Sequence, residues 1–210
     1  MPSTAARPLA YPPAVQRVVD AAARKSVELE VVLFAESTHT AADAARAVGA
    51  EVGQIVKSLV FVNAGDDGPE PCLALVSGAN TVDLARLAAV LGQSRMRRAT
   101  ADEARALTGF VIGGIPPFGH PTALRTVMDP DLGRFEMVWA AAGTPNAVFA
   151  VAPATLRMLA NATAAPIVHE QPVTRHDGPT ARLDAPPSAE PPTPAVAHDA
   201  AQEARTPIDA

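Results

Sequence analysis

Ser58-Leu59-Val60-Phe61-Val62 and Cys72-Leu73-Ala74-Leu75-Val76 are two short apolar stretches, rich in residues that favour β-strands. The sequence Gly65-Asp66-Asp67-Gly68 lies between them, and glycine and aspartate in such a cluster are typical of a turn. Two strand-like runs separated by turn residues predict a β-hairpin.

Around the hairpin, residues 13–170 alternate further short strands with short helices. Helices are expected over 14–25, 41–48, 81–91 and 153–162, and another is expected to begin at Thr100. Further strands are expected over 30–34, 96–99, 122–128, 134–142 and 147–152. Thr40 and Thr100 are each followed three residues later by an acidic residue, the pattern of a helix N-terminal capping box. The order predicts an α+β fold: a single domain with a mixed, largely antiparallel sheet flanked by short helices. No glycine fingerprint of a dinucleotide or P-loop site follows a strand.

The two ends of the chain differ in composition from the middle. Residues 1–12 contain three prolines with little pattern and are expected to form a flexible arm. Residues 171–210 are rich in proline, alanine and acidic residues, cannot bury enough apolar surface to offset their chain entropy, and are expected to be disordered. The net charge of −5 argues against a protein that coats nucleic acid by charge alone, although a local basic patch could still grip one end of an RNA.

Cys72 is the single cysteine of the chain, so no intramolecular disulfide can form. Its apolar surroundings favour a buried structural thiol over a nucleophile. The sequence shows no basic-then-apolar leader and no apolar run of about 20 residues that could span a bilayer. These features predict a cytoplasmic protein with no membrane contact.

The stretch Gly113-Gly114-Ile115-Pro116-Pro117-Phe118-Gly119-His120 holds three glycines and two prolines in eight positions. Glycine permits close approaches that a Cβ would block, and proline restricts the backbone. Such a loop can hold backbone N–H groups around a small ligand, or it can be an ordinary tight connection.

Lys57 is the only lysine after Lys25 in a chain that otherwise uses arginine. Its ammonium could serve as a compact point charge in a site. It could equally be a side chain whose stem packs on the strand while its head stays in water. Because an ordinary lysine has a pKa near ~10.4, it would be a poor general base at neutral pH.

Three segments, in this order and at these separations, resemble the YbaK-type aminoacyl-tRNA deacylase domain, which also occurs as the editing insertion of bacterial prolyl-tRNA synthetases. They are residues 55–61, residues 113–119 and Ala142-Gly143-Thr144-Pro145-Asn146-Ala147-Val148-Phe149. The resemblance covers about residues 14–170. It implies trans-editing: hydrolysis of the ester that links a wrong amino acid to tRNA, usually proline-specific tRNA, without a metal, a cofactor or a serine or cysteine triad.

The resemblance also implies site residues. The lysine most tied to activity matches Lys57, the hydroxyl residue after it matches Ser58, and the family's G-x-x-x-P loop matches Gly113 and Pro117. We expect Lys57, Gly113, Gly114 and Pro117 to act in catalysis, with Lys57 supplying charge and positioning. We expect substrate contacts from Phe34, Ser58, Gly119, His120, Gly143 and Asn146. The implied partners are the 3′ acceptor end of mischarged tRNA and prolyl-tRNA synthetase.

The loop exit departs from the best-known members, because His120-Pro121 stands where they carry lysines, which leaves the amino acid open. His120 could touch the substrate or bond a loop carbonyl. A tRNA-end binding module without catalysis is the alternative function, and an enzyme for another acylated substrate is a third. The five histidines show no metal-ligand spacing, and Asp129 to Gly133 is typical of a turn. The sequence also contains one basic cluster, which is either a solvated surface or a contact for RNA: Arg95, Arg97, Arg98 and Arg105.

Overall fold

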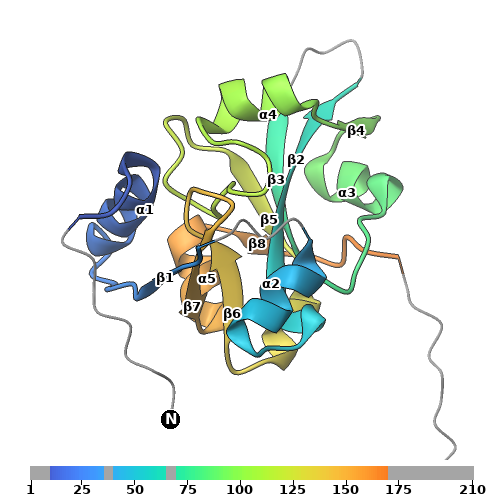
Figure 1. Cartoon of the computed structure of the whole chain (residues 1–210). Coiled ribbons are helices and arrows are strands. Elements are labelled where there is room, and N and C mark those ends of the chain that lie inside the picture. The colour runs from blue at the N-terminus through green and yellow to red at the C-terminus, as the bar shows by residue number, and fades with distance from the viewer. Residues whose placement is uncertain (1–9, 36–39, 65–69, 170–210) are drawn as a thin grey trace, which may run out of the picture. The chain divides into compact units, whose positions relative to one another are not determined.

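The computed structural model describes residues 10–35, 40–64 and 70–169 (Figure 1). Its helices are α1 (Pro13–Ala23), α2 (Ala41–Val48), α3 (Leu84–Leu91), α4 (Ala101–Thr108) and α5 (Pro153–Ala160), with short 3₁₀ helices at η1 (Val52–Gln54) and η2 (Pro130–Arg134). Its strands are β1 (Val31–Leu33), β2 (Ile55–Asn63), β3 (Pro71–Ser77), β4 (Met96–Arg98), β5 (Arg125–Met128), β6 (Val138–Ala141), β7 (Ala147–Val151) and β8 (Thr163–Ala164).

The strands form one mixed sheet in the order β1-β7-β6-β2-β3-β5-β8, with β4 also paired to β2. Four pairings are antiparallel, namely β1–β7, β2–β3, β2–β4 and β6–β7. Three are parallel, namely β2–β6, β3–β5 and β5–β8. The predicted hairpin is confirmed, because β2 and β3 pair antiparallel from Val56↔Ser77 to Val62↔Pro71. The predicted α+β class with a mixed sheet and short helices is confirmed as well.

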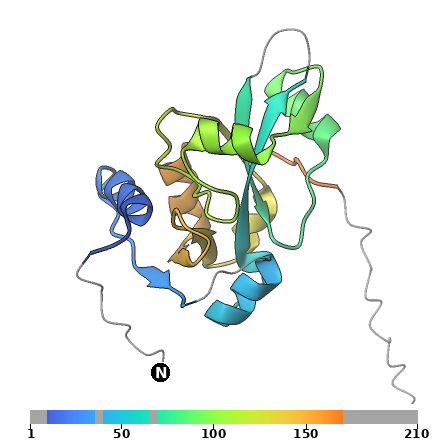
Figure 2. The same ribbon diagram turned by 45° about the horizontal axis from the view of Figure 1, so that its top comes forward.

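Helices cover both faces of the β2–β3 hairpin. One face packs with α1, α4 and α5 in a core that includes Val60 and Leu73. The other face packs with α3 in a second core that includes Phe61 and Cys72. Figures 1 and 2 accordingly place α1 and α3 on opposite sides of the hairpin. Burial on both faces explains why these strands read as continuous apolar runs.

Local signals set most element ends as predicted. Thr40 accepts from the backbone N–H of Asp43, and Thr100 accepts from that of Glu103, so both capping boxes are present. Pro153 occupies the first turn of α5, the position where its missing N–H costs no helical bond. Cys72 is buried, and burial raises the pKa of its thiol to about 12, in line with a structural role.

Several element ends differ from the expectations: the strand predicted over 122–128 begins only at Arg125, and two others differ for a clear local reason. The strand predicted over 134–142 begins only at Val138, because Asp129 caps the 3₁₀ helix η2 by accepting the Asp131 N–H at 3.1 Å. The helix predicted from residue 81 begins at Leu84, where Asp83 accepts two backbone N–H groups.

The expected terminal segments fall mostly outside the described residues. Residues 1–9 and 170–210 belong to that part, so the flexible arm and the disordered tail stay predictions. Tyr11, within the predicted arm, packs against the main core. No helix in the part of the chain that the structure describes is long and apolar enough to cross a membrane.

Candidate active site

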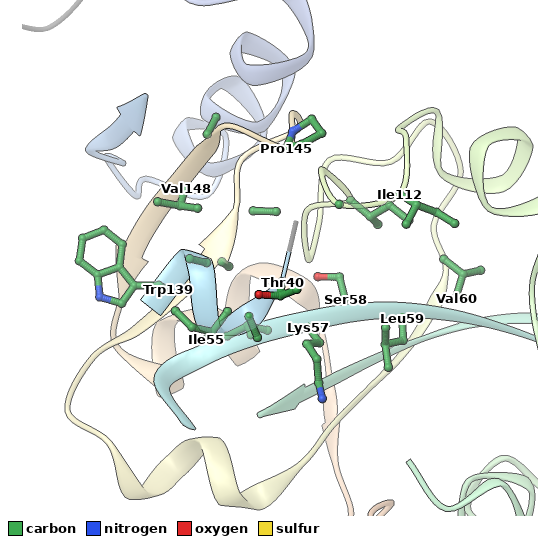
Figure 3. A pocket seen from close by; sticks show the side chains of 18 of the residues that line it. Thr40, Ile55, Lys57, Ser58, Leu59, Val60, Ile112, Trp139, Pro145 and Val148 are labelled. Carbon is green, nitrogen blue, oxygen red and sulfur yellow. The ribbon is translucent and has the colours of Figure 1, made fainter. Parts of the chain in front are cut away.

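A cavity of about 230 Å³ lies beside β2, on the edge opposite β3, where no described strand pairs with β2 between β6 and β4. One side is formed by α2 and the β6–β7 hairpin, and the other by α4 and the loop that follows it. Lys57 and Ser58 of β2 line it (Figure 3), and so does Gly113, which is distant from them in the sequence. The structure therefore brings together the strand and the loop that the sequence analysis selected.

The lining is mostly apolar, with many small side chains. Two described lining residues are basic, Lys57 and Arg98, and none is acidic. Thr40 and Ser58 add hydroxyl groups. The cavity therefore combines small apolar walls and two hydroxyl groups with positive charge from two basic residues.

The Lys57 side chain turns to the side of β2 opposite Ser58 (Figure 3). Its ammonium donates to the carbonyl oxygen of Gly78 at 3.0 Å and to that of Asn80. Burial, and secondly the charge of Arg98, lowers the pKa of Lys57 from its ordinary value. Strand alternation explains the direction, since neighbouring residues point to opposite faces. Lys57 therefore ties β2 to the turn after β3 and contributes positive charge next to the cavity.

Ser58 lies on the cavity side of β2, with its hydroxyl pointing away from Lys57 (Figure 3). The Oγ atom is buried and has no hydrogen-bond partner among the described residues. An unpaired buried hydroxyl costs about 1–3 kcal/mol, so a hydroxyl of this kind on a cavity wall requires a functional or structural explanation.

The Gly113–Gly114 pair fits the loop against the β6–β7 turn. Gly113 has φ +88°, a conformation that favours glycine. A Cβ on Gly114 would lie 2.7 Å from the backbone of Thr144, so only glycine allows this close approach. The Gly114 N–H donates to the Val111 carbonyl at 3.0 Å, which leaves it unavailable to a ligand in this arrangement. Gly114 thus shapes the cavity wall without lining it.

The other predicted site residues surround the cavity without lining it. Gly119 and Gly143 both have positive φ and pack against α1, where a Cβ on Gly143 would meet the Ala14 carbonyl oxygen at 2.6 Å. The side-chain amide of Asn146 donates to the main-chain carbonyl of Phe34 at 3.0 Å. The main-chain carbonyl of Asn146 accepts the Phe34 N–H at 2.8 Å. These contacts hold the β6–β7 turn and the end of β1 in place.

His120 and Pro117 belong to the interior of the loop. The His120 ring nitrogen Nε2 lies 2.9 Å from the Pro116 carbonyl oxygen, and its ring meets Phe110 edge-on. Burial lowers the pKa of His120. Pro117 is buried beneath the loop surface. Of the two interpretations of His120, the geometry shows the loop hydrogen bond.

Several lining residues were missed by sequence reasoning. Ile112, Trp139 and Val148 line the cavity, but isolated apolar residues carry no signal that separates a pocket wall from a core. Arg98 was assigned only to a basic cluster. In that cluster Arg97 makes a bidentate ion pair with Glu103, at 2.8 and 2.7 Å, whereas Arg98 is exposed at the cavity. In the part that the structure describes, no three His, Cys, Asp or Glu side chains come together as a metal site.

The glycine at position 114 gives a direct test of this wall. Gly114→Ala should lower the free energy of unfolding by about 1–3 kcal/mol, because the loop must move away from Thr144. Chemical denaturation measures the change. Gly133→Ala is the matched control, since a Cβ there meets nothing within 4 Å, and it should stay within about 0.5 kcal/mol of the parent. Equal stability of the two variants would contradict the proposed close packing.

Comparisons with known proteins identify related sequences and folds. The family model described as the aminoacyl-tRNA editing domain matches residues 35–159. The Escherichia coli (strain K12) protein named multifunctional Ser/Thr-tRNA deacylase ProXp-y is 33% identical over 128 residues, covering 59% of this chain and 74% of that protein. The Bacillus subtilis (strain 168) protein YwhH is 30% identical over 129 residues, 61% of this chain and 80% of the relative.

A solved structure described as a candidate trans-editing enzyme for prolyl tRNA synthetase is 46% identical, with a TM-score of 0.70. The match covers 77% of this chain and 100% of the chain in that structure. Because the family model matches more than half of the sequence and the fold agrees, the chain belongs to the aminoacyl-tRNA editing domain family.

Proposed function

We propose that this protein is a trans-editing deacylase that hydrolyses the ester bond of mischarged tRNA. The observation that carries the proposal is the convergence of Lys57, Ser58 and Gly113 on one cavity within a domain of the editing family. An aminoacyl ester is already activated, so the site has to place the ester, admit a water and stabilise the oxygen that becomes negative. Water oxygen bonds to the carbonyl carbon, the bond to the ribose oxygen breaks, and that oxygen takes a proton.

The substrate we propose is proline-specific tRNA that carries cysteine, alanine or a similarly small amino acid. Ligand pockets commonly measure about 300–1,000 Å³, so a cavity of about 230 Å³ suits one small aminoacyl group better than a nucleotide. The names of relatives support small side chains: the Escherichia coli protein is named for Ser and Thr, and one from Enterococcus faecalis (strain ATCC 700802 / V583), 25% identical, for Cys. The acceptor end would then lie outside the cavity, where Arg98 can meet a phosphate.

Prolyl-tRNA synthetase is the partner we propose, since an editing factor that acts in trans must meet tRNA soon after charging. The likeness to a structure described in those terms supports it.

A panel of charged tRNAs tests the function. The full-length protein is mixed with proline tRNA charged in turn with alanine, cysteine, serine, threonine and proline, and release of the amino acid is followed. We expect hydrolysis of at least one small mischarged amino acid well above the uncatalysed rate, with correctly charged prolyl-tRNA spared. Tight binding of the same tRNAs without turnover of any would contradict the enzyme and establish a binding module in its place.

A further inference from the structure

The edge of β2 that faces the cavity has a gap in its pairing. On this edge β6 pairs only with Ile55 and Val56, and β4 pairs only with residues 61–63. On the opposite edge β3 pairs continuously from Val56 to Val62. Among the residues that the structure describes, residues 57–59 therefore have no strand partner on this edge, which leaves a short length of open strand edge inside the site.

The hydrogen bonds around this gap show which main-chain groups face it. The Val60 carbonyl accepts from the Ala99 N–H at 3.0 Å on the cavity edge. The Asn63 N–H donates to the Glu70 carbonyl on the β3 edge. Because residues along a strand direct these groups alternately to its two edges, Ser58 directs both its N–H and its C=O toward the gap.

Ser58 also supplies an independent sign of a ligand. Its buried Oγ atom has no hydrogen-bond partner among the described residues and lies on the cavity side of β2 (Figure 3). Three polar groups of one residue thus converge on the same space: a main-chain donor, a main-chain acceptor and a hydroxyl.

We infer that the aminoacyl group of the substrate pairs with Ser58 as though it were one residue of the missing strand. This inference rests on the proposed function. In an antiparallel sheet two facing residues exchange two bonds, each N–H donating to the other's C=O. An α-aminoacyl ester carries the same two groups on either side of its Cα. The Ser58 N–H then donates to the ester carbonyl, and the α-ammonium donates to the Ser58 carbonyl.

The arrangement has chemical consequences. The Ser58 N–H polarises the carbonyl that water attacks and stays bonded to the oxygen as it becomes negative. Side chains of facing strand residues lie on the same face of a sheet, so an L-amino acid directs its side chain to the Ser58 side, among the cavity walls. The Ser58 carbonyl selects acyl groups that have an α-ammonium.

Unmodified protein and altered substrates test the inference without any mutation. The same tRNA is acylated with alanine or with propionate, which lacks only the α-ammonium. Each enzymatic kcat/KM is divided by the uncatalysed rate constant of that ester, because the ammonium itself activates an ester. We expect the corrected value for alanyl-tRNA to exceed that for propionyl-tRNA by about 10- to 100-fold. Equal corrected values would overturn the inference.

Two variants test the Ser58 groups themselves. Ser58→Pro removes an N–H that makes no ladder bond, so the fold should survive, while kcat/KM falls by about 100-fold or more. Leu59→Pro is the matched control for folding, because Leu59 faces β3 opposite Ala74 and loses a ladder bond. Ser58→Ala should lower kcat/KM by about 10-fold with an unchanged or raised melting temperature, since it removes an unpaired hydroxyl. Exposed Ser94→Ala should change neither.

The outcomes separate this inference from the proposed function. Hydrolysis of alanyl-tRNA with no preference over propionyl-tRNA, or full activity in a folded Ser58→Pro, leaves a deacylase whose β2 edge does not bind the acyl group. Absence of turnover on every charged tRNA removes the proposed function and this inference together.

Discussion

Lys57→Ala should lower kcat/KM for the preferred mischarged tRNA by about 100-fold while the protein stays folded. The ammonium lies beneath the strand that carries Ser58 and is held by the Gly78 and Asn80 carbonyls. A unit positive charge close to a developing negative oxygen, at an effective dielectric of about 20, contributes about 3 kcal/mol, or about 100-fold in rate. The loss should appear mainly in kcat, because the charge acts on the oxygen that becomes negative.

Lys25→Ala is the matched control for this variant. Lys25 also donates to two main-chain carbonyls, those of Met158 and Leu159, each at 2.9 Å, and it does not line the cavity. Both variants should lose about 1–2 kcal/mol of stability, since each deprives two carbonyls of a charged donor. Only Lys57→Ala should lose activity. Equal activities of the two variants at equal stability would show that Lys57 only stabilises the structure and does not contribute to catalysis.

Ala141→Phe should abolish most of the activity by occupying the cavity. Ala141 is half-buried at the end of β6, lines the cavity and pairs with Val148 on β7. A phenyl ring there takes up the room that the aminoacyl group needs, and a misplacement of about 1 Å can already cost about 100-fold in rate. We expect kcat/KM to fall by about 100-fold with little loss of stability, because the ring enters a cavity rather than a packed core.

Ala89→Phe provides the comparison for the added ring. Ala89 is exposed on α3, which packs on the core on the other side of the hairpin. Its activity and melting temperature should equal those of the parent. If Ala141→Phe turned over mischarged tRNA as fast as Ala89→Phe does, the acyl group would have to bind outside this cavity.

Local residue patterns predicted the elements of this fold better than their arrangement. The hairpin, the two capping boxes and the proline-initiated α5 depend on neighbours in the sequence, and each is present. The parallel pairings of β2 with β6 and of β3 with β5 join distant segments. Their register is set by packing between elements, which a single sequence does not record. The gap in β2 pairing, which creates the cavity, was therefore beyond sequence reasoning.

For the site as well, the residues could be predicted better than their arrangement. Lys57, Ser58 and Gly113 were selected as site residues and line the cavity. The direction of the Lys57 side chain follows from strand register and could not be read from its neighbours. The resemblance led us to expect substrate contacts from Gly143 and Asn146, but neither residue lines the cavity. The structure shows one in contact with α1 and the other bonded to Phe34.

The most direct measurement is the rate at which the purified full-length protein releases alanine from alanyl-tRNA specific for proline, under single-turnover conditions, beside the rate without protein. We predict an acceleration of at least about 100-fold that disappears in Ala141→Phe and persists in Ala89→Phe. No acceleration with alanine, cysteine, serine or threonine on that tRNA, by protein shown to be folded and to bind it, would contradict the assignment of this cavity to ester hydrolysis.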